Sequence, residues 1–248
     1  MVRTKGRSAM VRGVRVLGMH RSGTSFVAGA FAAAGYCIGS EADVMGPAAD
    51  NPFGFFERLD VVACNDGLLG ELGASWMSPP VPEVVRANRL RLVPKVAAVY
   101  ETMVTHAAGN PIVLKDPRLG LLLPVWDTVI GDDLLDLLVV RNPLDIAASL
   151  HRRNGFPAHF SLALWHLYTV STLQALRGRP VLVANFDRIS SCVSEREQWG
   201  QAVGKELRRV GLAFPQLDFF SGPSKHYRSR ESDLLDIAAP EQLQLWRY

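Results

Sequence analysis

The chain has 248 residues, a length that an α/β domain often reaches as a single unit. Its 27 basic and 24 acidic residues leave a net charge of +3, which is too small to indicate a nucleic-acid binder with a concentrated basic face. A hydrophobic fraction of 48% with 21% charged residues is typical of globular proteins and excludes wholesale disorder. No uncharged apolar run reaches about 18 residues, so we expect no membrane span.

The three cysteines, Cys37, Cys64 and Cys192, are widely spaced and form no CxxC pair. They predict neither a zinc site nor a disulfide framework, and they favour a reducing, cytoplasmic compartment. Several arginines and a lysine near the N-terminus are not followed by the apolar stretch of a secretory signal. We therefore expect a flexible basic tail over 1–13 and one domain over 14–248.

In the first half of the chain, a β-type run at 14–17 leads into a glycine loop. The apolar, Ala-rich stretch at 26–35 then predicts a buried helix that ends at a glycine. Residues 39–56 are rich in Gly, Pro, Asp and Asn and predict a long loop, which in a compact domain is usually functional. Helices are expected at 57–72 and 83–106, and Pro94 should start, kink or split the second one.

Further strands are expected at 112–114, 134–140 and 181–184. The second of these is nearly all apolar and lacks alternation, as expected for a parallel strand covered on both faces. Helices are expected after Pro143, around Trp165, over 195–210 and briefly near the C-terminus. Strands that alternate with helices predict an α/β fold. We expect a P-loop-type three-layer fold with a central, mainly parallel sheet.

The loop Gly18-Met-His-Arg-Ser-Gly-Thr-Ser25 nearly fits the phosphate-binding pattern GxxxxGK[ST]. In such loops backbone N–H groups curl around an anion, and the following helix adds its positive dipole end. Thr24 stands at the position of the lysine that reaches the β- and γ-phosphates of ATP or GTP, and a cation stands earlier, at Arg21. The loop therefore predicts a terminal-anion site unsuited to a nucleoside triphosphate, and the alternative is a tight turn with incidental glycines.

His20-Arg-Ser-Gly-Thr-Ser25 resembles the 5′-phosphosulfate loop of sulfotransferases that use PAPS (3′-phosphoadenosine 5′-phosphosulfate). This resemblance implies that the donor's phosphosulfate end is bound by Arg21, Ser22, Gly23, Thr24 and Ser25. The run from Arg141-Asn-Pro to Ser149 is similar to the 3′-phosphate motif of the same family, so Arg141 and Ser149 would hold the 3′-phosphate. The alternative for Arg141 is an ion pair with Asp145 at the start of a helix.

Lys115-Asp116-Pro117-Arg118 resembles a run found in many bacterial sulfotransferases. Lys115 would stabilise charge on the bridging oxygen during transfer. Pro117 stands where the cytosolic eukaryotic enzymes have a catalytic histidine, so that role does not carry over. The alternative is a strand-end turn in which Asp116 pairs with Arg118.

Asn51-Pro-Phe-Gly-Phe-Phe-Glu57 resembles the NPxGxFE run of bacterial members, and related enzymes often have a glutamate base in this stretch. We therefore expect Glu57 to take the acceptor's proton, with the neighbouring phenylalanines excluding water. The alternative is an acidic residue in the first turn of a helix, where it is favoured by the helix dipole. His20 is the second candidate for the base and Asp116 the third.

Late in the chain, Ser224-Lys-His-Tyr-Arg228 resembles a His-x-Arg stretch of bacterial relatives, which would let His226 and Arg228 close over the nucleotide. A solvated basic loop is the simpler interpretation of this segment. The Phe, Pro and Trp residues of the 39–56 loop and of 76–82 favour an apolar or ring-containing acceptor.

The resemblance implies transfer of a sulfuryl group from PAPS to a hydroxyl or amine of a small molecule, glycan or natural product. The product would be adenosine 3′,5′-bisphosphate, and no metal would be required. One alternative is a small-molecule or nucleoside kinase with a divergent P-loop, and another is a non-catalytic nucleotide-binding protein.

Overall fold

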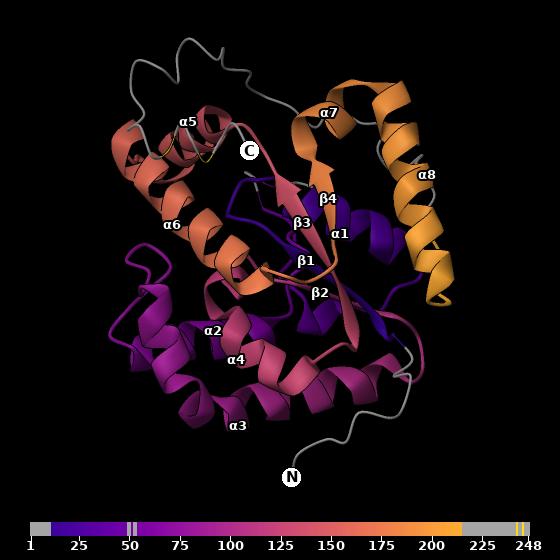
Figure 1. Cartoon of the computed structure of the whole chain (residues 1–248), viewed down its shortest axis with the longest axis horizontal. Coiled ribbons are helices and arrows are strands. Elements are labelled where there is room, and N and C mark those ends of the chain that lie inside the picture. Colours follow the sequence, from indigo (N-terminus) through magenta and orange to yellow (C-terminus); the bar gives the residue numbers. More distant parts are fainter. Residues whose placement is uncertain (1–10, 49–50, 52–53, 215–241, 243–244, 246–248) are drawn as a thin grey trace.

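The computed structural model describes residues 11–48, 51, 54–214, 242 and 245, and within them four parallel strands form a sheet in the order β2-β1-β3-β4 (Figure 1). The strands are β1 (Gly13–Leu17), β2 (Ile112–Lys115), β3 (Leu134–Val140) and β4 (Val181–Asn185). All four strands that the sequence predicts are present. Because the chain runs outward from β1 to β2 and then crosses to β3, the topological switch point lies between β1 and β3.

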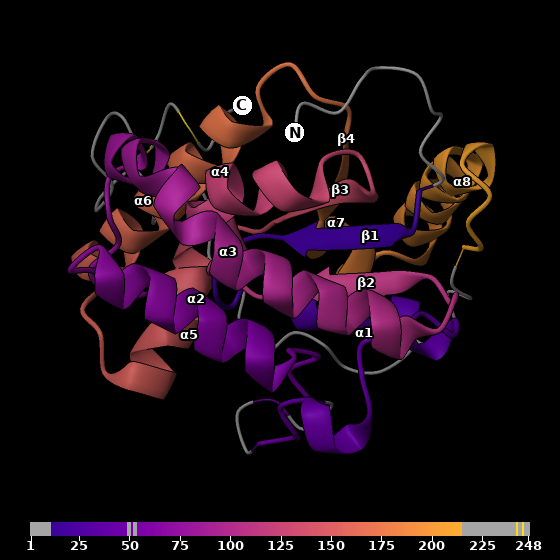
Figure 2. The same ribbon diagram turned by 90° about the horizontal axis from the view of Figure 1, so that it is seen from below.

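Helices cover both faces of the sheet, and this makes three layers (Figure 2). On one face the core is closed by α3 (Pro82–Ala107), α4 (Leu119–Ile130) and α6 (Ala158–Leu176). On the other face it is closed by α1 (Thr24–Ala33), α7 (Phe186–Ser191) and α8 (Val193–Arg209). The predicted three-layer α/β fold with a parallel sheet is thus confirmed.

The burial of β3 follows from this two-sided cover. Successive side chains of a strand point to opposite faces. Leu138 packs with the first cluster and Leu137 and Val139 with the second, so apolar residues are needed on both faces, and Asp136 is the one charged residue of the strand. This explains the absence of alternation over 134–140 in the sequence.

Two further helices add buried residues to the first of these clusters. α2 (Leu59–Glu71) packs against α3, and α5 (Pro143–Asn154) packs against α6. The long loop before α2 holds a short 3₁₀ turn, η1 (Glu41–Asp43). Both ends of α5 have clear local causes, since Pro143 occupies its first turn and Gly155 its left-handed C-cap.

The helix boundaries correct the sequence predictions in three places. α3 runs through Pro94 without starting or splitting there, because Leu92 and Val96 on either side of it are buried in the core. α4 is missing from the sequence predictions, since it begins with an almost unbroken apolar run, which periodicity alone does not assign to a helix or a strand. α2 begins at Leu59, so Glu57 precedes the helix and the first-turn interpretation of Glu57 is wrong.

The N-terminal boundary also differs from the sequence prediction by a short distance. Gly13 belongs to β1, and the Arg12 backbone N–H donates to the Asp133 carbonyl at 2.6 Å. The tail expected over 1–13 therefore does not reach Gly13. Residues 1–10 lie outside the described part of the chain.

A buried charge network ties the sheet to α4. Arg15 in β1 is fully buried, and it pairs with Asp136 in β3 at 2.7 Å and with Asp127 in α4 at 2.8 Å. Arg179, just before β4, bonds the same two carboxylates at 2.6 Å each. The two arginines and two aspartates compensate one another's charge within the low-dielectric interior.

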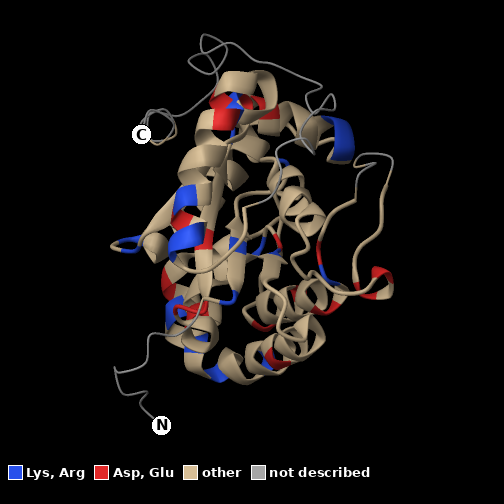
Figure 3. Ribbon diagram, turned by 90° about the vertical axis from the view of Figure 1, so that its right-hand side faces the viewer, with Lys and Arg blue, Asp and Glu red and all other residues tan. Residues whose placement is uncertain are grey.

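The surface carries both signs of charge. In Figure 3, Lys and Arg residues alternate with Asp and Glu residues along the helices of the side in view. Among the described residues, no helix is both long enough and apolar enough to cross a bilayer.

Candidate active site

The loop after β1 lies at the switch point of the sheet, where parallel α/β proteins bind ligands. It turns tightly because three residues have positive φ: Gly18 at 147°, Arg21 at 67° and Gly23 at 97°. A Cβ at Gly18 would lie 2.7 Å from the Val139 carbonyl oxygen, so glycine lets the loop approach β3. Arg21 is not a glycine, and its left-handed backbone is a local strain of the kind found at functional sites.

The loop ends at the N–H groups of the first turn of α1. This helix has no side-chain cap and no acidic residue in its first turn, so nothing in that turn competes with an anion. Ser22 Oγ and His20 Nε2 are buried and have no hydrogen-bond partner among the described residues. Buried polar atoms in this state indicate a place for a polar ligand.

The two anion motifs of the sequence meet at this loop. Arg21 Nε donates to Ser149 Oγ at 2.8 Å, and Arg141 Nη1 donates to the Arg21 carbonyl at 2.9 Å. Ser149 lies in α5 and Arg141 directly after β3, so the carboxyl ends of β1 and β3 are bridged by these bonds. The sequence predicts one pocket for each motif, whereas the structure joins Arg21 to the Arg141–Ser149 pair.

Arg141 is held on several sides. Asp145 Oδ2 lies 3.9 Å from its Nη2, as the ion-pair interpretation expects, and Asp187 Oδ1 lies 4.0 Å from its Nε. The guanidinium also stacks over the Phe186 ring, 5.1 Å from its centroid. Burial lowers the pKa of Arg141 from its ordinary value, while the charges of Asp145 and Asp187 raise it and so help to keep the buried cation charged.

A cavity of about 880 Å³ opens beside this cluster, at the carboxyl ends of β3 and β4. The loop contributes Gly18 and Ser22 to its wall, and the end of β3 contributes Arg141. α6 adds an apolar and aromatic side with Trp165 and Tyr168. A volume of this size is in the range of small-molecule and cofactor sites.

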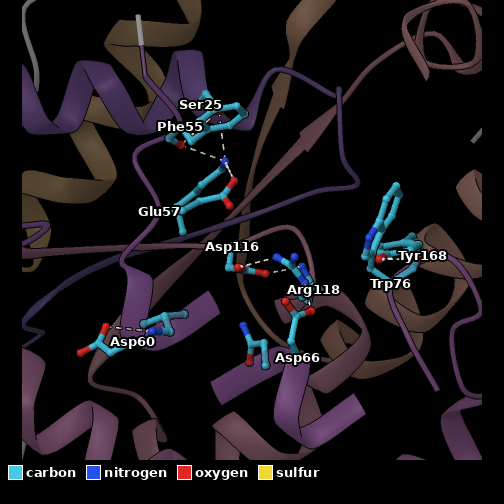
Figure 4. Close-up of polar contacts among 12 residues, drawn as sticks. Ser25, Phe55, Glu57, Asp60, Asp66, Trp76, Asp116, Arg118 and Tyr168 are labelled. Atoms are coloured by element: carbon cyan, nitrogen blue, oxygen red, sulfur yellow. Dashed lines mark hydrogen bonds and ion pairs between the residues drawn. The ribbon is translucent and has the colours of Figure 1, made fainter. Parts of the chain in front are cut away.

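Lys115 and Glu57, two of the predicted catalytic residues, form a buried ion pair (Figure 4). Their side chains are only 2% and 7% exposed. Lys115 Nζ also donates to Ser25 Oγ at 3.1 Å and to the Phe55 carbonyl at 3.0 Å. These three oxygens account for the three hydrogens of the ammonium group.

Asp116 lies beside this pair but is engaged elsewhere. It accepts a bond from the Arg118 backbone N–H at 2.7 Å and from the Arg118 guanidinium at 3.0 Å, and Arg118 also pairs with Asp66 at 2.6 Å (Figure 4). Burial raises the pKa of Asp116 to about 6, against the opposing effect of Arg118. The turn with an Asp116–Arg118 pair that the sequence analysis considered is therefore present.

His20 lies against an aromatic wall. The centroid of its ring is 4.7 Å from that of Trp76 and 5.7 Å from that of Tyr168. The Tyr168 hydroxyl donates to the Trp76 carbonyl at 3.0 Å (Figure 4). Burial, and then the charges of Arg118, Lys115, Arg153 and Arg21, hold the pKa of His20 well below its usual range. The imidazole is therefore neutral at physiological pH, and the same burial and positive charges weaken it as a base.

The remaining predicted residues divide into two groups. Gly23, Thr24 and Ser25 lie at the start of α1, as the motif predicts. His226 and Arg228 lie outside the described residues.

Sequence reasoning missed Phe186 and Asp187, which lie in the first turn of α7. A signal for them was present, since Asp187 closely follows a predicted strand, where parallel sheets carry their functional side chains.

Sequence comparison finds no protein-family model and no curated protein that matches this chain. Two solved structures match it over 97% of its length. One is the sulfotransferase domain from the curacin biosynthetic pathway, with a TM-score of 0.56 and 12% identity over 98% of that chain. The other is the sulfotransferase domain from the Synechococcus PCC 7002 olefin synthase, with a TM-score of 0.50 and 16% identity over 86% of that chain. The chain thus shares the fold of sulfotransferase domains, as its motifs predict.

Proposed function

We propose that this protein is a sulfotransferase that moves the sulfuryl group of PAPS to a hydroxyl or amine of a small molecule. The acceptor atom forms a bond to sulfur, and the bond from sulfur to the bridging oxygen of the 5′-phosphate breaks. The acceptor's proton goes to a side-chain base, and adenosine 3′,5′-bisphosphate leaves. As in phosphoryl transfer, the protein contributes mainly positioning and electrostatic stabilisation.

The observation that carries this proposal is the junction of Arg21, Ser149 and Arg141 beside an 880 Å³ cavity. Two arginines that follow separate strands, together with a serine of α5, suit a ligand with two anionic groups. PAPS has such groups at its 5′ and 3′ positions, whereas the anionic groups of ATP form one chain at the 5′ position. Thr24 at the lysine position of the loop is a further argument against a nucleoside triphosphate.

Glu57 is the base in this proposal, and the ion pair with Lys115 holds its carboxylate in place. Because all three hydrogens of Lys115 are engaged, the ammonium must exchange one of its present acceptors to contact the bridging oxygen. The Ser25 hydroxyl is the simplest one to release, since Ser25 also bonds the Phe55 carbonyl at 3.2 Å. Lys115 is then able to stabilise the leaving oxygen while it remains paired with Glu57.

For the acceptor we propose an apolar or ring-containing small molecule, a class that includes glycans and natural products. The aromatic wall of Trp76 and Tyr168 next to the loop supports this choice, because flat apolar surfaces bind rings. The two domains of similar fold come from an olefin synthase and a natural-product pathway, which agrees with a small-molecule acceptor.

Ligand binding tests the donor. Adenosine 3′,5′-bisphosphate at about a hundred times its Kd should stabilise the protein by about 2.7 kcal/mol, a rise in melting temperature of roughly 5–10 °C for a chain of this size. AMP, which lacks the 3′-phosphate, should give a clearly smaller rise. Stabilisation by ATP with magnesium but not by the bisphosphate would refute the proposal and favour a kinase.

Turnover tests the base. Glu57→Gln should lower turnover with PAPS by about a hundredfold or more, the usual contribution of a general base, with bisphosphate affinity retained. His20→Gln is the matched variant, because it replaces the second base candidate with a neutral side chain. Near-normal turnover in Glu57→Gln together with a large fall in His20→Gln would transfer the role to His20.

A further inference from the structure

The first turn of α7, directly after β4, reaches the anion cluster from the edge of the sheet. Asp187 Oδ2 accepts a hydrogen bond from the Asn142 backbone N–H at 2.6 Å. Its other oxygen faces Arg141 Nε at 4.0 Å. One carboxylate thus contacts the backbone of the β3–α5 turn and faces the side chain that this turn carries.

Phe186, the residue before Asp187, packs against the same cluster of Arg141 and the loop after β1. Its ring lies under the Arg141 guanidinium and packs edge-on against Phe26 at 5.5 Å. A Cβ at Gly23 would lie 2.2 Å from this ring, so Phe186 touches the anion loop as well. The first turn of α7 therefore joins the loop after β1 to the turn after β3.

These contacts define the orientation of Arg141 before any ligand binds. A guanidinium is a rigid plane, so fixing part of it directs all of its N–H groups. Nη1 is bonded to the Arg21 carbonyl and Nε faces Asp187. Asp145 lies in the first turn of α5, four residues after Arg141, and so belongs to the same segment of the chain. Asp187 instead connects this segment to the end of β4.

We propose that Asp187 is a positioning residue that holds the β3–α5 turn through the Asn142 N–H and so aims Arg141 at the donor's 3′-phosphate. This inference rests on the proposed function. Asp187 does not bind the phosphate itself, because two anions repel. Replacing Asp187 should therefore lower affinity only for ligands that carry a 3′-phosphate, the group that Arg141 binds in this proposal.

The test compares two nucleotides by calorimetry. In Asp187→Ala, affinity for adenosine 3′,5′-bisphosphate should fall about tenfold, as expected when a charged hydrogen bond loses its alignment, while affinity for AMP stays within about twofold. Asp187→Asn keeps an acceptor for the Asn142 N–H and should keep the preference for the bisphosphate. Asp132→Ala, an exposed site with the same change of charge, is the control and should leave both affinities unchanged.

The inference is overturned if Asp187→Ala keeps the full preference, or if it weakens both nucleotides by the same factor. If Asp187→Asn loses the preference for the bisphosphate over AMP to the same extent as Asp187→Ala, Asp187 does not act through its hydrogen bond with the Asn142 N–H. A wild-type protein with no preference for the bisphosphate would instead contradict the proposed function, so the two failures are distinguishable. Melting temperatures of the variants without ligand show whether each one is folded.

Discussion

The buried ion pair between Lys115 and Glu57 allows a stability prediction that does not depend on the reaction. Lys115→Met keeps the length of the side chain and removes its charge. The Phe55 carbonyl still accepts from Ser25 in this variant, so the main cost is a buried Glu57 carboxylate that has lost its cation. Breaking a buried pair on one side typically costs about 3–5 kcal/mol.

We therefore expect Lys115→Met to lower the free energy of unfolding by about 3 kcal/mol, at the lower end of that range because Glu57 is 7% exposed. For a chain of this size that is a fall in melting temperature of roughly 6–12 °C. The double variant Lys115→Met/Glu57→Gln should recover part of the loss, since a neutral amide costs less to bury than an unpaired carboxylate. The difference between single and double variants measures the coupling of the pair.

Urea unfolding of the variants provides the measurement, with the midpoint and the slope both recorded. Lys95→Met is the matched control, because Lys95 pairs with Glu71 on the surface, where its side chain is 59% exposed. Surface pairs contribute about 0–1 kcal/mol, so this variant should change stability little. A loss in Lys115→Met no larger than that in Lys95→Met would refute the reasoning.

Three further predictions concern the loop, the donor cation and pH. Gly23→Ala should abolish bisphosphate binding, because its Cβ would overlap the Phe186 ring. Gly35→Ala is the control and should keep binding, since Gly35 also has positive φ but open space around it. Equal binding by both variants would contradict the predicted overlap. Arg141→Ala should lose most bisphosphate affinity by calorimetry, and unchanged affinity would remove its assignment to the 3′-phosphate. Burial raises the pKa of Asp116 from 3.8 to about 6, so the folded chain binds a proton between these pH values that the unfolded chain has released. The free energy of unfolding of the wild-type protein should therefore fall by about 2 kcal/mol as pH rises from about 4 to about 6. Urea titrations of Asp116→Asn should show no such fall. An unchanged pH profile in this variant would show that Asp116 is not the group responsible.

The sequence by itself determined the strands, their parallel arrangement and the residues at their carboxyl ends. These features are local, since an apolar run without alternation indicates a strand covered on both faces and a glycine pattern indicates a loop that holds an anion. Arg21, Lys115 and Arg141 were each identified from the few residues around them. Where the local pattern was ambiguous, as in the apolar run that begins α4, the helix was not predicted.

Only the tertiary structure decided which of these residues touch. Arg21 and Ser149 are 128 positions apart, and Lys115 and Glu57 are 58 apart. Such contacts depend on the strand order β2-β1-β3-β4, which brings the ends of β1 and β3 together. The same order sets Arg15 opposite Asp136, and the pairing of β4 with β3 brings Asp187 to Arg141. Local sequence patterns do not encode strand order, because it follows from the packing of the whole chain.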